Sequence, residues 1–186
     1  DPTGSVVRML FAEESAARFA IDAELAHEPG RVWSYSSATS NGLSELLRAS
    51  FGDDDDALRA YHSFPRAMLF DPAGMASAVL ETDPSGTFVL SSYCWATARD
   101  WARFGLLLLD DGVIGGRRVL GEEWVATMRT PAPASNGVYG RHLWLNAGHP
   151  DDPERRTYPA LPTDLAYAGG FEDQILAIVP SRELVV

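Results

Sequence analysis

The segment from Thr97 to Gly112 constrains the fold most, because it carries the start, the buried face and the end of one helix. Thr97 and Asp100 have the spacing of a capping box, in which a hydroxyl and a carboxylate each satisfy a free backbone N–H. Gly112 suits the position just after a helix. The apolar residues between them recur at helical spacing: Trp101, Phe104, Leu107 and Leu108. The segment therefore predicts one amphipathic helix.

Apolar spacing predicts further helices at 6–11, 14–21, 38–51 and 122–128, with Gly52 after the third. The turn at 28–30 precedes a short extended segment at 31–34. Four consecutive acids at 53–56 lack the central glycine and terminal glutamate of a calcium loop. They are typical of a solvated helix N-terminus, where negative charge is favourable.

Extended segments are expected in the remaining parts of the chain. Residues 77–82 and 87–92 flank the turn sequence Asp83-Pro84-Ser85-Gly86 and predict a hairpin. Residues 139–146 predict a strand, and the polar, proline-rich segment 148–162 predicts a loop. Residues 175–179 and 184–186 are apolar and β-prone, and they are expected to pair through the turn at 180–183.

The composition of the chain argues against several classes of binding partner. The 186 residues carry a formal net charge of -11, so little attraction to nucleic acid or anionic lipid is expected. No stretch approaches the roughly 18 apolar residues of a membrane span.

All 15 basic residues are arginine, so no lysine amine is available within this chain. The one cysteine, Cys94, excludes an intrachain disulfide and fits a reducing compartment. The compartment itself stays open, because the chain begins at Asp1 without Met and an upstream targeting signal could be lost.

Four stretches together resemble the serine β-lactamase-like superfamily, nearest its branch of 6-aminohexanoate-dimer hydrolases and related esterases. Each stretch is weakly specific alone, but their order and spacing extend over nearly the whole chain. They are Pro29-Gly30-Arg31-Val32-Trp33-Ser34-Tyr35-Ser36-Ser37; Leu69-Phe70-Asp71-Pro72-Ala73-Gly74-Met75; Thr97 to Gly105 with Leu120-Gly121-Glu122-Glu123-Trp124; and Ala168-Gly169-Gly170-Phe171-Glu172-Asp173-Gln174 leading to Val186.

The resemblance implies an α+β fold, in which helices flank an antiparallel sheet and a mostly helical subdomain lies beside it. Three motifs meet at the active site of this superfamily. They are a Ser-x-x-Lys, a Tyr-x-Asn or similar triplet, and a Lys-Thr-Gly or its substitute on a strand. Because the chain has no lysine, it cannot contain the first motif. We therefore expect residues 1–186 to be one partial domain, the C-terminal part of a hydrolase whose nucleophile segment precedes Asp1.

The resemblance also assigns candidate site residues. Tyr35-Ser36-Ser37 is similar to the Tyr-x-Asn triplet, and Ala168-Gly169-Gly170 is similar to the Lys-Thr-Gly element. Tyr35 is then the candidate general base and acid, although a buried structural tyrosine fits the triplet alone. Ser37 either bonds the missing lysine or the substrate, or caps the following helix.

The glycine motif has two interpretations as well. Gly169 and Gly170 either let a substrate approach the strand backbone or form a simple kink. The resemblance implies that the N–H of Phe171 supplies half of an oxyanion hole. Asp173 departs from the family, which often has glycine there, and this leaves the loop conformation open. Tyr93 and Trp95 either line the substrate cleft or serve packing.

The expected activity is hydrolysis of a small-molecule amide or ester through an acyl-serine intermediate, with no cofactor. The alternatives are a binding or sensor module that has lost its nucleophile, and a hydrolase that pairs a serine of this chain with a histidine. Neither His27, His62, His142 nor His149 has a metal-ligand partner at useful spacing, so no metal is expected. The 186 residues alone are expected to be inactive.

Overall fold

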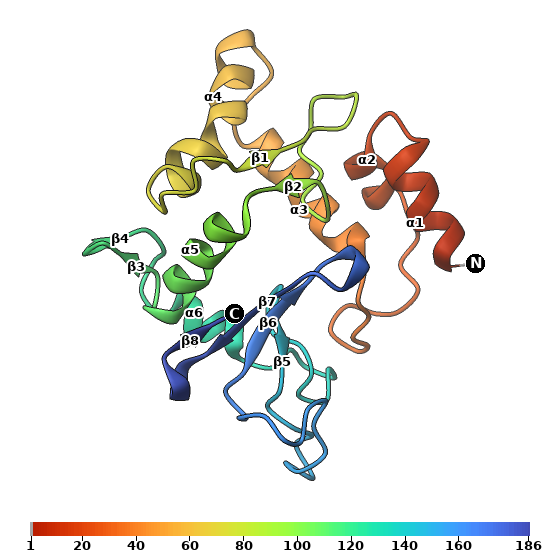
Figure 1. Cartoon of the computed structure of the whole chain (residues 1–186). Helices are drawn as coiled ribbons and strands as arrows, with labels where there is room; N and C mark the ends of the chain where they lie inside the picture. Colours follow the sequence, from red (N-terminus) through yellow and green to blue (C-terminus); the bar gives the residue numbers. More distant parts are fainter. Residues whose placement is uncertain (1) are drawn as a thin grey trace. The chain divides into compact units, whose positions relative to one another are not determined.

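The computed structural model describes residues 2–186, and contacts divide these into two units (Figure 1). Unit 1 comprises the residues up to Ala26 together with Tyr35–Phe70 and Ser77–Ala96. Unit 2 comprises His27–Ser34, Asp71–Ala76 and Thr97–Val186. Each unit combines segments that are far apart in the sequence, and each is described here by itself.

Unit 1 is mostly helical. Its helices are α1 (Pro2–Phe11), α2 (Ala16–Ile21), α3 (Ser37–Ala49) and α4 (Asp55–Pro65), and a short π-helical turn follows at Arg66–Phe70. The acidic run at 53–56 starts α4 as predicted: the Asp54 carboxylate accepts the N–H of Ala57 at 2.8 Å. The helix forms there because the cap satisfies a free N–H and the acids of the first turn favour the positive end of the helix dipole.

Tyr61 of α4 is the centre of the unit 1 core. Its ring is fully buried and packs against the rings of Phe51 and Phe88. Its hydroxyl accepts the backbone N–H of Phe88 at 2.9 Å. The hydroxyl of Ser44 donates to the Phe88 carbonyl at 2.6 Å, so both backbone groups of Phe88 are satisfied by side chains.

The predicted turn at 83–86 is present, but the strand pairing differs from the expected hairpin. Asp83 and Thr87 close the turn with a backbone bond of 2.8 Å. Strand β1 (Val79–Leu80) pairs with β2 (Cys94–Trp95) and not with 87–92. The Asp83 carboxylate accepts the backbone N–H groups of Ser85 and Thr87 and stabilises this turn. The pairing continues through the bridge at Phe88 to Val89, whose N–H donates to the Glu81 carbonyl at 3.1 Å. A second turn, closed by the Ser92 N–H and the Val89 carbonyl at 3.2 Å, then separates this hairpin from β2.

Unit 2 contains a four-stranded antiparallel sheet in the order β5-β6-β7-β8. The strands are β5 (Trp144–Leu145), β6 (Ala166–Gly169), β7 (Ile175–Val179) and β8 (Leu184–Val185). The predicted pairing of the last two strands through the turn at 180–183 is confirmed. A further pair of backbone bonds, 2.8 and 2.9 Å long, joins Ala177 and Val186.

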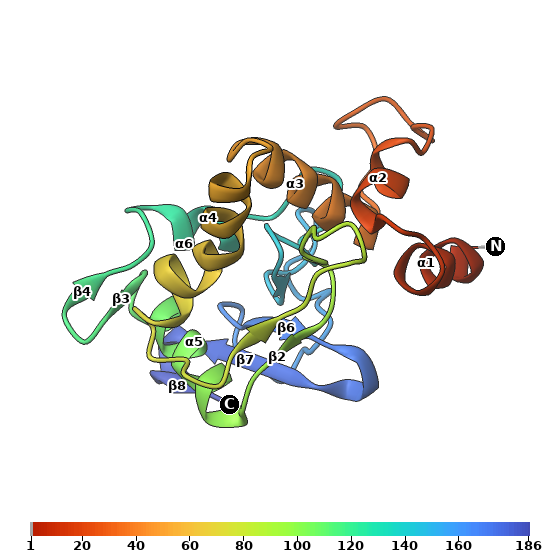
Figure 2. The same cartoon turned by 90° about the horizontal axis from the view of Figure 1, so that it is seen from above.

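Helix α5 (Ala98–Leu109) covers one face of this sheet and contacts β7 and β8 (Figure 2). Its predicted start is confirmed by the hydroxyl of Thr97, which accepts the N–H of Asp100 at 3.3 Å. Its end is confirmed by Gly112, which has a positive φ and donates to the Leu107 carbonyl at 2.7 Å. The buried core between helix and sheet consists of Leu108, Val125, Leu143, Leu145, Ala166, Leu176 and Ile178.

The rest of unit 2 corrects one sequence prediction. The segment 139–146 is a tight turn followed by β5, because Gly140 donates to the Leu143 carbonyl at 2.9 Å and Leu145 donates back to Val138 at 2.8 Å. The turn before residue 31 is present, since Arg31 donates to the Glu28 carbonyl at 3.2 Å, and residues 32–34 belong to no helix or strand. The predicted last helix is α6 (Trp124–Arg129), and a small hairpin of β3 (Val113–Ile114) and β4 (Arg117–Arg118) precedes it. The predicted loop at 148–162 is confirmed. The combination of helices with an antiparallel sheet confirms the predicted α+β fold class.

Candidate active site

Tyr35 lies directly before α3, and 56% of its surface is exposed. This environment rules out the alternative of a tyrosine buried in packed hydrocarbon. An exposed phenol at the start of a helix is accessible to a ligand or to another part of a protein.

Ser36, and not Ser37, is the N-cap of α3. The Ser36 backbone is extended, and its hydroxyl accepts the N–H of Ala38 at 3.2 Å. Ser37 is the first helical residue and is half-buried. The capping role proposed for Ser37 is therefore wrong by one residue, since the helix begins earlier than its first apolar residue indicates. Ser37 stays a candidate for contact with a substrate or a lysine.

The other candidates lie together at the end of β6 in unit 2. Alternate residues of a strand point to opposite faces. Ala166 and Ala168 point to the α5 core, and Tyr167 and Gly169 therefore lie on the opposite face. Because the Ala168 methyl packs against the core, only the backbone of Ala168 is available to a substrate.

Gly169 and Gly170 are not required by the internal packing of the chain. Neither has a positive φ. A Cβ on Gly169 would lie 3.8 Å from the Trp144 ring, and one on Gly170 would lie 3.4 Å from Cβ of Gln174. Contacts of about that length are ordinary or only slightly tight, so a small side chain would fit at either position. The absence of side chains therefore leaves space along the strand that the described residues do not fill.

The tip of the β6–β7 hairpin presents Phe171 to solvent, with 85% of its surface exposed. Gly170 donates to the Gln174 carbonyl at 2.8 Å, which closes the ladder before Phe171. The Gln174 amide donates to the Phe171 carbonyl at 3.0 Å. Glu172 and Asp173 both have positive φ, at 59° and 61°. The left-handed conformation that favours glycine is thus present at 173, although this chain has aspartate there.

Five aromatic rings form a continuous chain of contacts beside this strand, a feature that sequence reasoning missed. Trp144 contacts Trp33, Tyr139 and Tyr167, with ring centroids 5.0 to 6.2 Å apart. Tyr158 packs edge-on against Tyr167 at 5.8 Å. The useful sequence signal was the alternation along β6, which places Tyr167 on the same face as Gly169.

Burial raises the pKa of Tyr167 to about 12, and the neighbouring hydroxyl of Tyr158 adds to this shift. The Tyr158 segment is held in place by Asn146, whose amide accepts the Tyr158 N–H at 2.9 Å. The same amide donates to the carbonyls of Tyr158, Leu161 and Pro162. Tyr167 is therefore a fixed, protonated phenol at ordinary pH.

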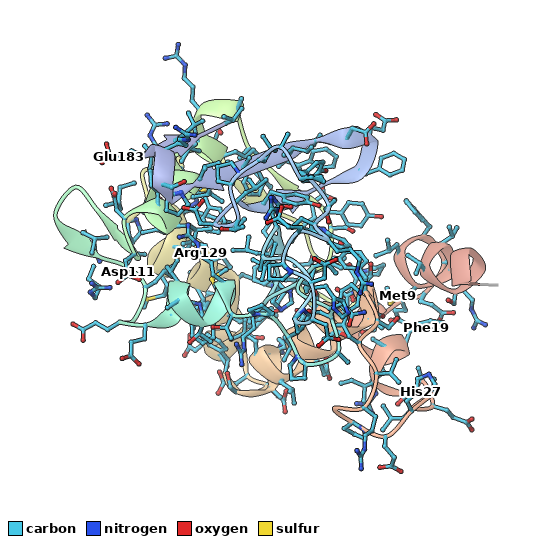
Figure 3. The ribbon with its side chains drawn as sticks, turned by 90° about the horizontal axis from the view of Figure 1, so that it is seen from below. Met9, Phe19, His27, Asp111, Arg129 and Glu183 are labelled. Atoms are coloured by element: carbon cyan, nitrogen blue, oxygen red, sulfur yellow. The ribbon has the colours of Figure 1, made fainter. Side chains whose placement is uncertain are left out.

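Arg129 is a partly buried cation at the end of α6 (Figure 3). Burial lowers its pKa, and the nearby charges of Asp164 and Asp111 act in the opposite direction. One terminal nitrogen donates to the Leu108 carbonyl at 3.5 Å. Its contacts are with the scaffold of unit 2, so we assign it a structural role.

Tyr93 and Trp95 lie on either side of Cys94 in unit 1. The Trp95 ring nitrogen donates to the Glu81 carboxylate at 2.7 Å. Burial, and then the Glu81 charge, raise the pKa of Tyr93, and burial raises the pKa of the Cys94 thiol. A thiol that is harder to ionise is a weaker nucleophile. Burial therefore gives Cys94 a packing role, while the hydrogen bond to Glu81 orients the Trp95 ring, 56% of whose surface is exposed.

His62 and His149 contact backbone groups. His62 Nε2 lies 2.8 Å from the Gly86 carbonyl, and the N–H of Asp151 donates to His149 Nδ1 at 3.2 Å. Within residues 2–186, no group of three His, Cys, Asp or Glu side chains has an arrangement suited to a metal ion. In the same residues, no helix has the length and apolar character needed to cross a membrane.

Comparison with known proteins identifies the family. A family model described as Beta-lactamase matches residues 3–186. The chain belongs to the beta-lactamase family. No curated protein matches this beta-lactamase-family chain.

Two solved structures share the fold of this chain. "Putative 6-aminohexanoate-dimer hydrolase from Bacillus anthracis" aligns with a TM-score of 0.68 and 23% identity over 90% of this chain and 40% of that one. "Crystal structure of putative beta-lactamase from Bacteroides dorei DSM 17855" aligns with a TM-score of 0.66 and 16% identity over 94% of this chain and 55% of that one. The beta-lactamase-family chain thus spans about half or less of the length of these two structures. The resemblance drawn from its four sequence stretches is confirmed.

Proposed function

We propose that this chain is part of a serine hydrolase that cleaves a small-molecule amide or ester through an acyl-serine intermediate. Residues 1–186 would form the C-terminal part of one hydrolase domain. The nucleophilic serine and its lysine would come from a Ser-x-x-Lys in polypeptide before Asp1. The family match over residues 3–186, together with an exposed tyrosine directly before a helix, carries this proposal.

Tyr35 takes the part of general base and acid. A serine hydroxyl is a weak nucleophile until its proton is removed. A phenol beside an ammonium ionises more readily, so a tyrosine next to a lysine can accept that proton. The serine oxygen then bonds to the carbonyl carbon, and Tyr35 returns the proton to the leaving alkoxide or amine. Water repeats the sequence on the acyl-serine and releases the acid. Ser37 helps to orient the lysine or the substrate.

The β6 end supplies the electrostatic part of the reaction. The backbone N–H of Phe171 and that of the upstream serine would bind the oxyanion that develops on the carbonyl oxygen. Two facts support this role: the β6–β7 ladder closes at Gly170, before Phe171, and the strand has no side chain at 169 or 170. A substrate can then lie against the backbone of Ala168, Gly169 and Gly170.

The test is a comparison of variants made in the protein encoded by the complete reading frame. Tyr35→Phe should lower the rate of nitrophenyl ester hydrolysis by about 10²- to 10⁴-fold, the range for loss of a general acid–base group. Tyr158→Phe removes one phenol oxygen elsewhere and should keep most of the activity. Mass spectrometry should detect an acyl adduct on the serine of the upstream Ser-x-x-Lys.

Two results would contradict the proposal: a complete frame without Ser-x-x-Lys, or a Tyr35→Phe enzyme as active as its parent. The 186-residue chain alone should give no rate above buffer.

A non-catalytic binding or sensor module is the second candidate, and the absence of lysine from these 186 residues favours it. Such a protein would bind ester or amide ligands without forming an adduct. Covalent labelling by a nitrophenyl ester excludes this second candidate.

A further inference from the structure

The β6–β7 hairpin tip combines exposed apolar surface with uncompensated negative charge. Phe171 and Ile175 are 85% and 58% exposed. The charged residues of the tip are two acids, Glu172 and Asp173. Neither acid belongs to any ion pair found among residues 2–186.

The strand itself contributes no positive charge to offset these carboxylates. From Ala166 to Val179 the sequence contains neither arginine, lysine nor histidine. Alanine stands at 168, where the family's Lys-Thr-Gly motif begins with lysine, and its methyl packs against the core. A substrate lying along this edge would therefore meet two negative charges and no cation from the hairpin.

Two hydrogen bonds hold the main chain at the hairpin tip, so the positions from which the two exposed acids project are set. The Gly170–Gln174 and Gln174–Phe171 bonds, at 2.8 and 3.0 Å, close the loop on both sides of them. Their left-handed conformation is uncommon for residues with a side chain and persists where surrounding structure maintains it.

We infer that this hydrolase accepts uncharged esters or amides with an apolar acyl group and discriminates against anionic substrates. The inference rests on the proposed function, because it takes the β6 edge as the place where the scissile carbonyl lies. The exposed Phe171 and Ile175 side chains supply apolar contact for the acyl chain, whose burial is favourable. Glu172 and Asp173 repel a carboxylate on the substrate, and repulsion between like charges in a partly solvated site is substantial.

The test compares nitrophenyl butyrate with nitrophenyl hydrogen succinate, whose acyl groups have the same number of carbons but differ by one carboxylate. In the protein from the complete reading frame, kcat/KM for butyrate should exceed that for succinate by at least about tenfold. The ratio should fall as salt is added, because salt screens exposed charges. The double variant Glu172→Gln/Asp173→Asn should reduce the ratio by about fivefold.

The matched control for charge is Glu122→Gln/Glu123→Gln. It also neutralises two adjacent exposed acids, one of which, Glu123, has a positive φ of 63°. This control should leave the butyrate-to-succinate ratio unchanged. If it lowers the ratio as much as the 172/173 variant does, overall charge and not the hairpin tip sets the preference, and the inference is wrong.

The apolar part has a separate test. The preference for nitrophenyl hexanoate over acetate should fall at least about threefold in Phe171→Ala, since each buried methylene is worth up to about fourfold in kcat/KM. Leu25→Ala removes an equally exposed apolar side chain from unit 1 and serves as the control.

The two failures can be told apart. No hydrolysis of any ester overturns the proposed function and the inference with it. Hydrolysis with equal rates on butyrate and succinate, or ratios that neither variant changes, overturns the inference alone.

Discussion

The hydroxyl of Tyr167 illustrates how a single residue takes its chemistry from its neighbours. The ring is stacked on Trp144 and meets Tyr158 edge-on. Burial, followed by the Tyr158 hydroxyl, raises the pKa of Tyr167 to about 12, compared with 10.0 for a free phenol. The folded chain therefore keeps this proton in a pH range where the unfolded chain releases it.

This shift predicts a loss of stability in alkaline solution. Below pH 10 both states hold the proton, and the contribution is fully present. Between about pH 10 and 12 only the folded state holds it, so stability falls as the pH rises through that window. An absorbance titration of phenolate should show one component near pH 12 that is absent from Tyr167→Phe.

Tyr158→Phe is the complementary variant, and it should move that component to lower pH because one cause of the shift is removed. A component near pH 12 that persists in Tyr167→Phe would show that another tyrosine is responsible.

At the same scale, local sequence does not decide between two neighbouring residues that can fill the same structural role. Ser36 and Ser37 are both good caps, and only the backbone angles decide that Ser36 is used. The left-handed conformation at 173 could be expected from the family's glycine, but the one at 172 had no sequence signal. Side-chain exposure at Tyr35 and Phe171 depends on packing, which local sequence does not specify.

Among the elements, α5 and the sheet approach each other closely at Gly105. A Cβ there would lie 2.4 Å from Val185 Cγ1 and 3.0 Å from Leu176 Cδ1. Real Cβ atoms do not approach so closely, so the Val185 and Leu176 side chains, or the strands that carry them, would have to shift. The glycine therefore sets the distance between helix and sheet in unit 2.

Gly105→Ala should lower the free energy of unfolding by about 1 kcal/mol. Overpacking costs about 1–3 kcal/mol, and the better helix propensity of alanine offsets up to about 1 kcal/mol of it. Urea unfolding followed by circular dichroism measures the change. Gly121→Ala is the control, because nothing lies within 4 Å of its Cβ position. An unchanged or higher urea midpoint for Gly105→Ala would show that the sheet adapts without cost.

Element boundaries with side-chain caps or turn residues were predictable, and pairings between distant segments were not. The start of α5 at Thr97, the start of α4 after Asp54 and the last hairpin all follow from local chemistry. The pairing of Val79–Leu80 with Cys94–Trp95 does not, because a second turn after Val89 interrupts the hairpin before β2. The short β5 depends on Gly140, which approaches the Met128 carbonyl too closely for any side chain.

For the molecule as a whole, each unit has its own buried centre. In unit 1 the Tyr61 hydroxyl is the acceptor for the Phe88 N–H, and its ring contacts other residues of that unit. In unit 2 the corresponding centre is the core between α5 and the sheet. The resemblance predicted a sheet region and a mostly helical region, and the fold class of the family is confirmed.

Tyr61→Phe should destabilise the protein by about 1–3 kcal/mol, because it leaves a buried N–H without an acceptor. Combined with Gly105→Ala, the two losses should add within about 0.5 kcal/mol, since the two sites share no contact partner. Denaturant unfolding of both single variants and the double variant measures this. A coupling above about 1 kcal/mol would contradict the independence of the two centres.

The interleaving of the two units has a consequence for how the protein is made. The chain passes between them five times, so residues 27–34 and 71–76 belong to unit 2 although they are translated among residues of unit 1. Trp33 must leave the ribosome long before Tyr139 and Trp144, the rings it packs against, are synthesised. Strands β7 and β8 of the same sheet follow later still. The nascent chain therefore exposes the unpacked Trp33 ring while more than a hundred further residues are synthesised, and during this interval a chaperone could protect it.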